Sequence, residues 1–290
     1  MNIGIIGIGC IGSSLARDLK KYQGYEIYVH DTNPDFLEKA RELSLAHHYG
    51  DIQKLASNCD LIFICVPVLA ILKVIEQILP HMKEGSIVTD VGSVKSTLYV
   101  NPKTMPEGVV YIPGHPITSG TNDSGPLAGR EDVFKERKWI ITPNKTASEL
   151  QVNKLRELLE SLGANVLSLT ANVHDEMLGF VSHLPHVMAF SAMQAAHDLN
   201  EKLDEDVFTF AGGSFMDLTR IAGGDPDMWR DIFITNKEGI LAACALFTSR
   251  MDELKKMIEN ENIEEIYQFV NTAHKIKTEN YPHQSTEGEI

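Results

Sequence analysis

The sequence is poor in cysteine, in positive charge and in long apolar runs, and each shortage excludes a class of protein. Its four cysteines, Cys10, Cys59, Cys65 and Cys244, are scattered without CxxC or cysteine–histidine spacing, which predicts no zinc site and reduced thiols in a cytoplasm. Lysine and arginine number 26 against 40 acidic residues, and the net charge of −14 argues against a nucleic-acid partner. No run is long enough to span a membrane, and no basic segment precedes an apolar one at the N-terminus, so neither a membrane anchor nor a signal peptide is expected.

What the sequence does contain is a glycine-rich turn near its start. Gly7, Gly9 and Gly12 have G-x-G-x-x-G spacing between an apolar strand expected over 2–7 and a helix expected over 11–23. The first glycine allows a tight turn, the second leaves room for a pyrophosphate, and the third lets helix and strand pack closely. Free N–H groups at the helix start point at the phosphates. The sequence therefore predicts a dinucleotide site formed by Gly7, Gly9, Cys10, Ile11 and Gly12.

Asp31 extends this predicted site and indicates which dinucleotide it binds. It ends a second predicted strand, 26–30, where a carboxylate accepts hydrogen bonds from a ribose diol. The same carboxylate would repel a 2′-phosphate, and no basic residue follows at 32–34, so NAD is favoured over NADP. A buried strand over 60–66 is expected to end at the cofactor, which adds Val66 and Pro67. The alternative is a glycine-rich turn in another kind of α/β protein.

Strands and helices alternate through the first part of the chain, and helices alone follow. The alternation predicts a Rossmann-type α/β domain, a doubly wound and mostly parallel sheet, over 1–170. From residue 171 the spacing of apolar residues is helical, which predicts an all-α domain over 171–290 with a frayed tail from Tyr281. Ile240 to Phe247 is apolar on more than one face, which favours a homodimer with intertwined helices. The further strands are expected over 86–91, 109–113, 138–142 and 164–169, and the further helices over 34–44, 69–81, 147–162, 173–199, 228–258 and 262–277.

Two polar clusters follow predicted strands of the sheet. His115 comes directly after the strand 109–113 and is well placed as a proton acceptor, because the ordinary pKa of histidine, ~6.5, is close to working pH. The alternative is a structural histidine that caps a loop. Ser93 could hydrogen-bond a substrate hydroxyl or orient His115, and Lys95 could hold a carboxylate or lie on the surface at a helix start.

A third polar cluster belongs to the helical part. His183 and His186 are one helical turn apart, with Pro185 expected to kink the chain between them. No third acidic or cysteine ligand is near, so no metal site is predicted. Asp217 and Arg220 share a helix face, and the planar donor fork of arginine suits a carboxylate. That carboxylate belongs either to a substrate or, in a structural ion pair, to Asp217.

Taken together, these motifs resemble those of the prephenate/arogenate (cyclohexadienyl) dehydrogenase family of tyrosine biosynthesis, from residue 1 to about 275. The glycine spacing is shared with many dehydrogenases. Gly-His-Pro at 114–116, Ser-His-Leu-Pro-His at 182–186 and Thr-Arg-Ile-Ala at 219–222 are much more specific. The resemblance implies a Rossmann domain followed by a helical dimerisation domain.

The resemblance also implies a reaction and roles for these residues. Prephenate would lose a hydride to NAD⁺ and a carboxyl group as CO₂, and would become 4-hydroxyphenylpyruvate. By similarity, His115 is the general base for the substrate 4-hydroxyl and Ser93 hydrogen-bonds the same hydroxyl. The residues predicted to bind the substrate are Arg220, which anchors a carboxylate, with His186, His183 and Asp217.

The chain departs from the family pattern after Gly-His-Pro. Similar sequences continue Ala-Gly-Thr-Glu after one variable residue, whereas 117–122 is one residue longer and places Asn122 where an acid is usual. Asp123 could replace that acid. The absence of the usual acid at position 122 favours prephenate over arogenate, because the side chain of arogenate carries an ammonium group. We expect no chorismate mutase domain before the fingerprint and no ACT domain after residue 275, and inhibition by tyrosine stays open.

Two other functions fit parts of the sequence. A β-hydroxyacid dehydrogenase has a similar N-terminal half, but such enzymes use a lysine in the helical domain and 171–200 contains none. A nucleotide-sensing or scaffolding protein could keep the fold without turnover, but His115, Ser93 and Arg220 argue against this. Measurable hydride transfer would exclude it.

Overall fold

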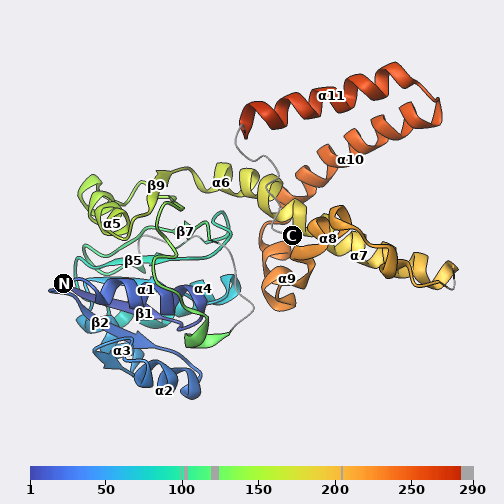
Figure 1. The fold of residues 1–290 in the computed structure, drawn as a ribbon. Coiled ribbons are helices and arrows are strands. Elements are labelled where there is room, and N and C mark those ends of the chain that lie inside the picture. Colours follow the sequence, from blue (N-terminus) through green and yellow to red (C-terminus); the bar gives the residue numbers. More distant parts are fainter. Residues whose placement is uncertain (99, 101–103, 119–123, 204, 282–290) are drawn as a thin grey trace. The chain divides into compact units, whose positions relative to one another are not determined.

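The computed structural model describes residues 1–98, 100, 104–118, 124–203 and 205–281. A six-stranded parallel sheet has the order β3-β2-β1-β4-β5-β6, the order of a dinucleotide-binding fold (Figure 1). Its strands are β1 (Asn2–Ile6), β2 (Glu26–His30), β3 (His48–Tyr49), β4 (Leu61–Ile64), β5 (Ile87–Asp90) and β6 (Val110–Tyr111), and the helices that alternate with them are α1 (Cys10–Lys20), α2 (Pro34–Glu42), α3 (Ile52–Asn58) and α4 (Val68–Ile78).

Both faces of this sheet are buried, which explains why its strands are nearly all apolar. Alternate residues of a strand point to opposite faces, so Ile5 belongs to one core and Ile6 to the other. The first core includes Leu15 of α1, and the second includes Ile71 and Ile75 of α4. The carboxyl ends of the parallel strands therefore open at one edge, where the glycine loop and the loop after β5 begin.

The later strands do not extend the parallel sheet. β7 (Gly114–Pro116), β8 (Lys138–Ile141) and β9 (Asn165–Ser168) form a second sheet, in which β7 and β8 are antiparallel. The predicted strand 109–113 is thus shorter, and His115, expected in a loop, lies within a strand paired with Ile140. The sequence prediction also lacked β3 and α3, although Asp51 caps α3 by accepting a hydrogen bond from the Lys54 N–H at 2.8 Å.

Only helices follow β9 in the described chain. The expected helix 173–199 is divided by a π-helical turn, Gly179–His183, which ends two residues before Pro185. Proline has no main-chain N–H to donate to the preceding turn. The expected helix 228–258 is divided at Asn236. The elements are α5 (Glu149–Ser161), before β9, then α6 (Ala171–Leu178), α7 (Leu184–Leu203), α8 (Gly213–Thr219), α9 (Pro226–Thr235), α10 (Lys237–Glu259) and α11 (Ile263–Asn280).

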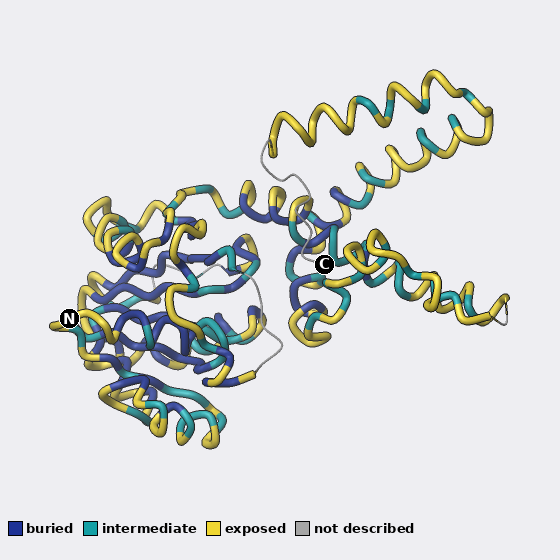
Figure 2. Tube along the Cα trace, viewed as in Figure 1, coloured by how far each residue is buried: buried dark blue, intermediate teal, exposed yellow. Residues whose placement is uncertain are grey.

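By contacts the chain separates into two compact units, 1–240 and 241–290. In the first, Trp229 and Ile232 of α9 join the core that covers α4, so α9 packs on the Rossmann sheet layer. In the second, α10 from Leu241 onward and α11 form a hairpin whose residues are largely exposed (Figures 1 and 2). Strands end at Ser168 and α6 begins at Ala171, while a domain boundary at 170 stays a prediction. No described helix is long and apolar enough to cross a membrane.

Candidate active site

The glycine loop has the geometry that its spacing predicts. Gly7 has φ of +95°, and its N–H donates to the His30 carbonyl at 2.8 Å, which holds the tight turn after β1. A Cβ on Gly12 would lie 1.9 Å from the Gly7 carbonyl oxygen, so only glycine fits there. A Cβ on Gly9 would meet nothing within 4 Å, so the loop keeps open space at this position.

The first turn of α1 faces that open space with unused donors. Gly9 is the N-cap residue, and the first intrahelical bond runs from the Ser13 N–H to the Gly9 carbonyl at 2.9 Å. The N–H groups of Cys10, Ile11 and Gly12 therefore have no acceptor within the helix. Donors at a helix N-terminus beside an open glycine suit a phosphate group.

Asp31 lies beside the glycine loop with acceptor capacity to spare. Its Oδ2 accepts a hydrogen bond from the Ile8 N–H at 2.7 Å, and its Oδ1 accepts one from the Asn33 N–H at 2.8 Å. A carboxylate has about four acceptor positions, so two remain for a ribose diol. After β4, Val66 lies against the Gly7 turn and Pro67 is the N-cap residue of α4. These residues fit a dinucleotide cofactor.

The loop after β5 is fixed by a buried ion pair between Asp90 and Lys95, both with fully buried side chains. The Lys95 ammonium also donates to the Gly114 carbonyl at 2.7 Å. The Asp90 carboxylate accepts further hydrogen bonds from the Tyr111 hydroxyl at 2.8 Å and the Gly92 N–H at 2.8 Å. The surface position considered for Lys95 from the sequence is therefore wrong. Its charge holds the loop to the residue before His115.

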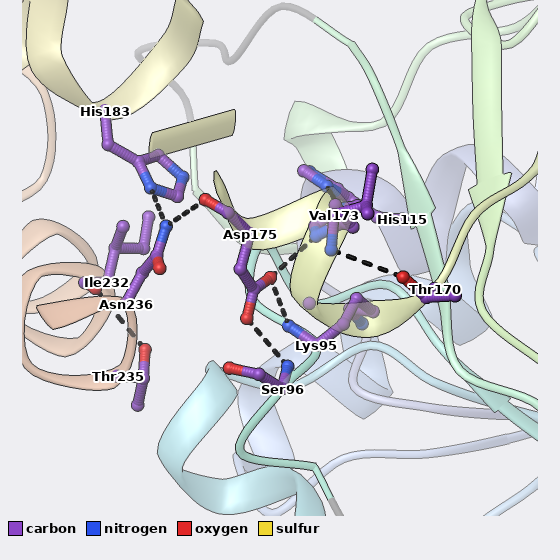
Figure 3. Close-up of polar contacts among 12 residues, drawn as sticks. Lys95, Ser96, His115, Thr170, Val173, Asp175, His183, Ile232, Thr235 and Asn236 are labelled. Carbon is purple, nitrogen blue, oxygen red and sulfur yellow. Dashed lines mark hydrogen bonds and ion pairs between the residues drawn. The ribbon is translucent and has the colours of Figure 1, made fainter. Parts of the chain in front are cut away.

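His115 is held by a chain of hydrogen bonds that starts at Asp175 (Figure 3). Asp175 Oδ1 lies 2.7 Å from Nδ1 of His174, and Nε2 of His174 lies 2.9 Å from Nδ1 of His115. A carboxylate only accepts, so His174 donates through Nδ1, and in its neutral form it accepts at Nε2. His115 then donates through Nδ1, which leaves its own Nε2 bare. Such a nitrogen can take a proton.

Burial keeps this histidine neutral. Desolvation lowers the pKa of His115 well below its ordinary value, and the nearby positive charge of Lys95 lowers it further. Burial alone would raise the pKa of Asp175, but hydrogen bonds from His174 and Ser96 lower it below its ordinary value. This chain of hydrogen bonds therefore has an ionised acid at one end and a neutral imidazole at the other.

Asp175 also connects the helical part to the loop after β5. Its Oδ1 accepts from the Lys95 N–H at 2.8 Å, and its Oδ2 accepts from the Ser96 N–H at 2.7 Å (Figure 3). This fixes the backbone next to Ser93, whose side chain is half-buried. Sequence reasoning missed both His174 and Asp175. The available signal was a His-Asp pair on the first turns of a helix, with His174 in register with the apolar Leu178.

Two more predicted histidines lie around the π-helical turn. His183 is buried, and its Nδ1 lies 2.9 Å from Nδ2 of Asn236, which sequence reasoning also missed. His186 donates through Nδ1 to the Ser182 carbonyl at 3.0 Å, and its ring stacks on Trp229 with centroids 3.6 Å apart. Burial lowers the pKa of both rings, that of His183 to about 4.

Arg220 and Asp217 lie close in the chain but do not pair. Both side chains are exposed, and among the described residues no ion pair joins them. Arg220 lies near enough to His186 for its charge to lower the pKa of that ring. The structural ion pair considered from the sequence is thus not formed here, and within the described ranges no acid pairs with the guanidinium. Asn122 and Asp123 lie outside the described residues.

Comparison with known proteins agrees with this geometry. A family model described as the nucleotide-binding domain of prephenate dehydrogenase matches residues 15–168, and one described as its dimerization domain matches 170–272. Cyclohexadienyl dehydrogenase of Zymomonas mobilis is 31% identical over 266 residues, which are 90% of this chain and 89% of that protein.

Solved structures give the same result over nearly the whole chain. Prephenate dehydrogenase from A. aeolicus in complex with hydroxyphenyl propionate and NAD⁺ has a TM-score of 0.89 at 30% identity, covering 96% of this chain and 98% of that one. Synechocystis arogenate dehydrogenase has a TM-score of 0.82 at 28% identity, covering 97% and 100%. The chain belongs to the prephenate dehydrogenase family.

Proposed function

We infer that the protein is an NAD-dependent dehydrogenase that converts prephenate to 4-hydroxyphenylpyruvate and CO₂ in tyrosine biosynthesis. The observation that carries this is the bare Nε2 of His115, fixed by His174 and Asp175. A fixed, neutral imidazole is the base that oxidation of an alcohol needs. Family membership supplies the substrate class, because relatives of this chain are named for prephenate or cyclohexadienyl substrates.

The cofactor supplies one part of the chemistry: NAD⁺, when bound, accepts the hydride that leaves C4 of the substrate. Gly7, Gly9, Cys10, Ile11 and Gly12 would hold its pyrophosphate at the start of α1. Asp31 would bind its ribose, and Val66 and Pro67 would border it after β4. The open space at Gly9 and the unused acceptor positions of Asp31 support this assignment.

His115 moves the proton that the reaction displaces. Its Nε2 accepts the proton of the 4-hydroxyl as the C4–H bond breaks and the C4 carbonyl forms. The C1 carboxylate then leaves as CO₂, and its electron pair enters the ring, which becomes aromatic. The protonated His115 can return the proton to the phenolate oxygen. Ser93 would hydrogen-bond the same oxygen from the loop that Asp175 fixes.

The substrate carries two carboxylates, and Arg220, which pairs with no acid among the described residues and lies near His186, suits one of them. Arg220 would bind a carboxylate with its planar donor fork. His186, His183 and Asp217 would complete the substrate site, which also positions the reacting carbon against the cofactor. Burial of His183 and the stacking of His186 on Trp229 keep these rings in one orientation.

We further propose a homodimer formed by the helical segment. The family model that matches 170–272 is described as a dimerization domain. A single chain leaves large apolar side chains of the hairpin exposed, which a partner would cover. The exposed apolar side chains of the hairpin include Leu241, Leu246, Met251, Ile258, Ile263, Tyr267, Val270 and Ile276.

A cytoplasmic location fits the four unpaired cysteines.

The test is NADH formation by the purified protein, followed by its absorbance, with NAD⁺ and either prephenate or arogenate. We expect turnover with prephenate, and a lower kcat/KM with arogenate or with NADP⁺. Turnover with arogenate alone would show that arogenate, and not prephenate, is the substrate. The absence of NADH with both substrates, although NAD⁺ binds, would overturn the proposal. Sedimentation velocity at several protein concentrations tests the dimer.

A further inference from the structure

Asp175 contacts two hydrogen-bond chains that run to different histidines. Its carboxylate leads through His174 to His115. Its main-chain carbonyl accepts a hydrogen bond from Nδ2 of Asn236 at 2.8 Å, and the same Nδ2 lies 2.9 Å from Nδ1 of His183. Figure 3 shows His115 and His183 on opposite sides of Asp175. The two chains share one residue, and each determines which ring nitrogen carries a proton.

The second chain fixes the orientation of the Asn236 amide. A carbonyl oxygen only accepts, so the group that faces the Asp175 carbonyl is the NH₂ group of Asn236. That NH₂ group has two hydrogens, and the second points at Nδ1 of His183. Nδ1 of His183 is therefore an acceptor without a proton. In a neutral imidazole the proton then lies on Nε2.

The two histidines thus offer a ligand opposite hydrogen-bonding groups at Nε2. His115 has a bare Nε2, whereas His183 has a protonated Nε2. Both rings are buried, which disfavours the doubly protonated form that would remove this difference. Asn236 and Asp175 are themselves almost fully buried, with 3% and 4% exposure, so water does not compete for their hydrogen bonds.

We propose that Asp175 is a positioning residue that gives the two histidines opposite hydrogen-bonding polarity, acceptor at His115 and donor at His183. The proposal rests on the proposed function for the roles of the two rings, and goes beyond it in assigning their tautomers. A neutral Nε2–H donor binds an oxygen acceptor and not an ammonium group. The substrate atom that meets His183 is therefore a hydroxyl, keto or carboxylate oxygen.

The direct test is ¹⁵N NMR of histidine-labelled full-length protein without substrate at neutral pH. Protonated and bare imidazole nitrogens have well-separated ¹⁵N shifts, and His115→Asn and His183→Gln variants assign the signals. We expect His115 to be protonated at Nδ1 and bare at Nε2, and His183 the reverse. The same tautomer in both rings, or an imidazolium at His174 that donates to His115, would overturn the proposal.

Kinetics on two variants test each chain separately. His174→Phe removes the acceptor for Nδ1 of His115, so we expect kcat to fall by about 10²- to 10⁴-fold, the usual size of a general-base contribution, with little change in KM. Asn236→Asp places an acceptor oxygen against Nδ1 of His183, so we expect KM to rise with a smaller change in kcat. Asp175→Ala removes the carboxylate that holds His174 but keeps the main-chain carbonyl that orients Asn236, so we expect it to lower kcat as His174→Phe does, without the rise in KM. If all three variants change kcat and KM by the same factors, these residues have a merely structural role.

Matched controls and a double variant separate positioning from folding. Glu176→Gln and Lys237→Gln change exposed neighbours of Asp175 and Asn236 and should leave both constants unchanged. If Asn236 acts through His183, adding Asn236→Asp to His183→Gln raises KM no further, whereas independent effects would multiply. The NMR result does not depend on turnover. A protein that lacks dehydrogenase activity but shows the two tautomers would overturn the proposed function alone.

Discussion

Lys95 and Asp90 form an ion pair with no exposed side-chain surface on either residue. The pair lies between the loop that carries Ser93 and the strand that carries His115, because Lys95 also donates to Gly114. Removing one partner of a buried pair leaves an uncompensated charge. The relation between these two residues thus governs both stability and the shape of the site.

We expect Lys95→Met to lower the free energy of unfolding by about 3–5 kcal/mol, the cost of breaking a buried ion pair from one side. Urea denaturation at neutral pH measures this. Lys73→Met, on the exposed face of α4, is the matched control and should change stability by at most ~0.5 kcal/mol. A loss of the same small size at Lys95 would show that the pair is not buried in solution.

His115→Asn should lower kcat by about 10²- to 10⁴-fold and leave the KM for prephenate nearly unchanged, because the base acts mainly in the transition state. Steady-state NADH formation with saturating NAD⁺ gives both constants. His197→Asn, which changes a histidine with an exposed side chain on α7, should have no effect. An unchanged kcat in His115→Asn would remove this residue from the mechanism.

Arg220→Ala should raise the KM for prephenate by about 10- to 100-fold, since a charge-assisted hydrogen bond contributes ~1.5–3 kcal/mol. Arg220→Lys keeps the charge but loses the planar fork, so we expect an intermediate KM. Arg41→Ala, which changes an exposed arginine of α2, is the control. If the KM of Arg220→Ala stays that of the parent enzyme, the guanidinium does not bind the substrate.

The sequence predicted the residues whose roles depend on local spacing. The glycine loop, Asp31 and His183 could be found because a turn, a strand end and a helix repeat are visible within a few residues. Partners far apart in the chain could not be found: Lys95 and Asp175 are separated by 80 positions, and His115 and His174 by 59. Such contacts depend on how α6 meets the loop after β5, and no periodicity encodes that. The burial of Lys95 escaped prediction although its partner Asp90 is close in the chain, because Gly114 and Asp175, which contact Lys95, come from distant segments.

Acid should destabilise the protein through its buried histidines. The pKa of His183 is about 4 in the folded protein and ~6.5 when unfolded, so the unfolded chain binds the extra proton first as pH falls. Stability is unaffected by this group above pH ~6.5 and decreases by about 3 kcal/mol between pH ~6.5 and ~4. His115, whose pKa is also lowered, acts in the same direction.

Urea denaturation at about pH 7 and about pH 4.5 measures this effect, and His183→Gln should reduce the difference between the two free energies of unfolding. The lost Asn236 contact lowers the stability of the variant equally at both pH values, so the comparison isolates the titration. His197→Gln should keep the parent's pH dependence, because its side chain is exposed. An equal difference in the parent and His183→Gln would mean that His183 is already accessible to protons in the folded state.

Asp31 should decide between the two nicotinamide cofactors. Its carboxylate repels a 2′-phosphate, so Asp31→Ser should raise the KM for NAD⁺ and lower the KM for NADP⁺, and the ratio of the two kcat/KM values should shift by at least about tenfold, the effect of 1.4 kcal/mol. Asp31 also accepts from the Ile8 N–H, so part of the loss with NAD⁺ comes from a looser glycine loop.

Asp31→Asn is the informative control variant, because it keeps an acceptor for Ile8 and removes the charge. If Asp31→Asn gains activity with NADP⁺ while Asp31→Ser only loses activity with NAD⁺, charge determines the preference for NAD and the hydrogen bond shapes the loop. If neither variant gains activity with NADP⁺, the space beyond Asp31, and not its charge, excludes the 2′-phosphate.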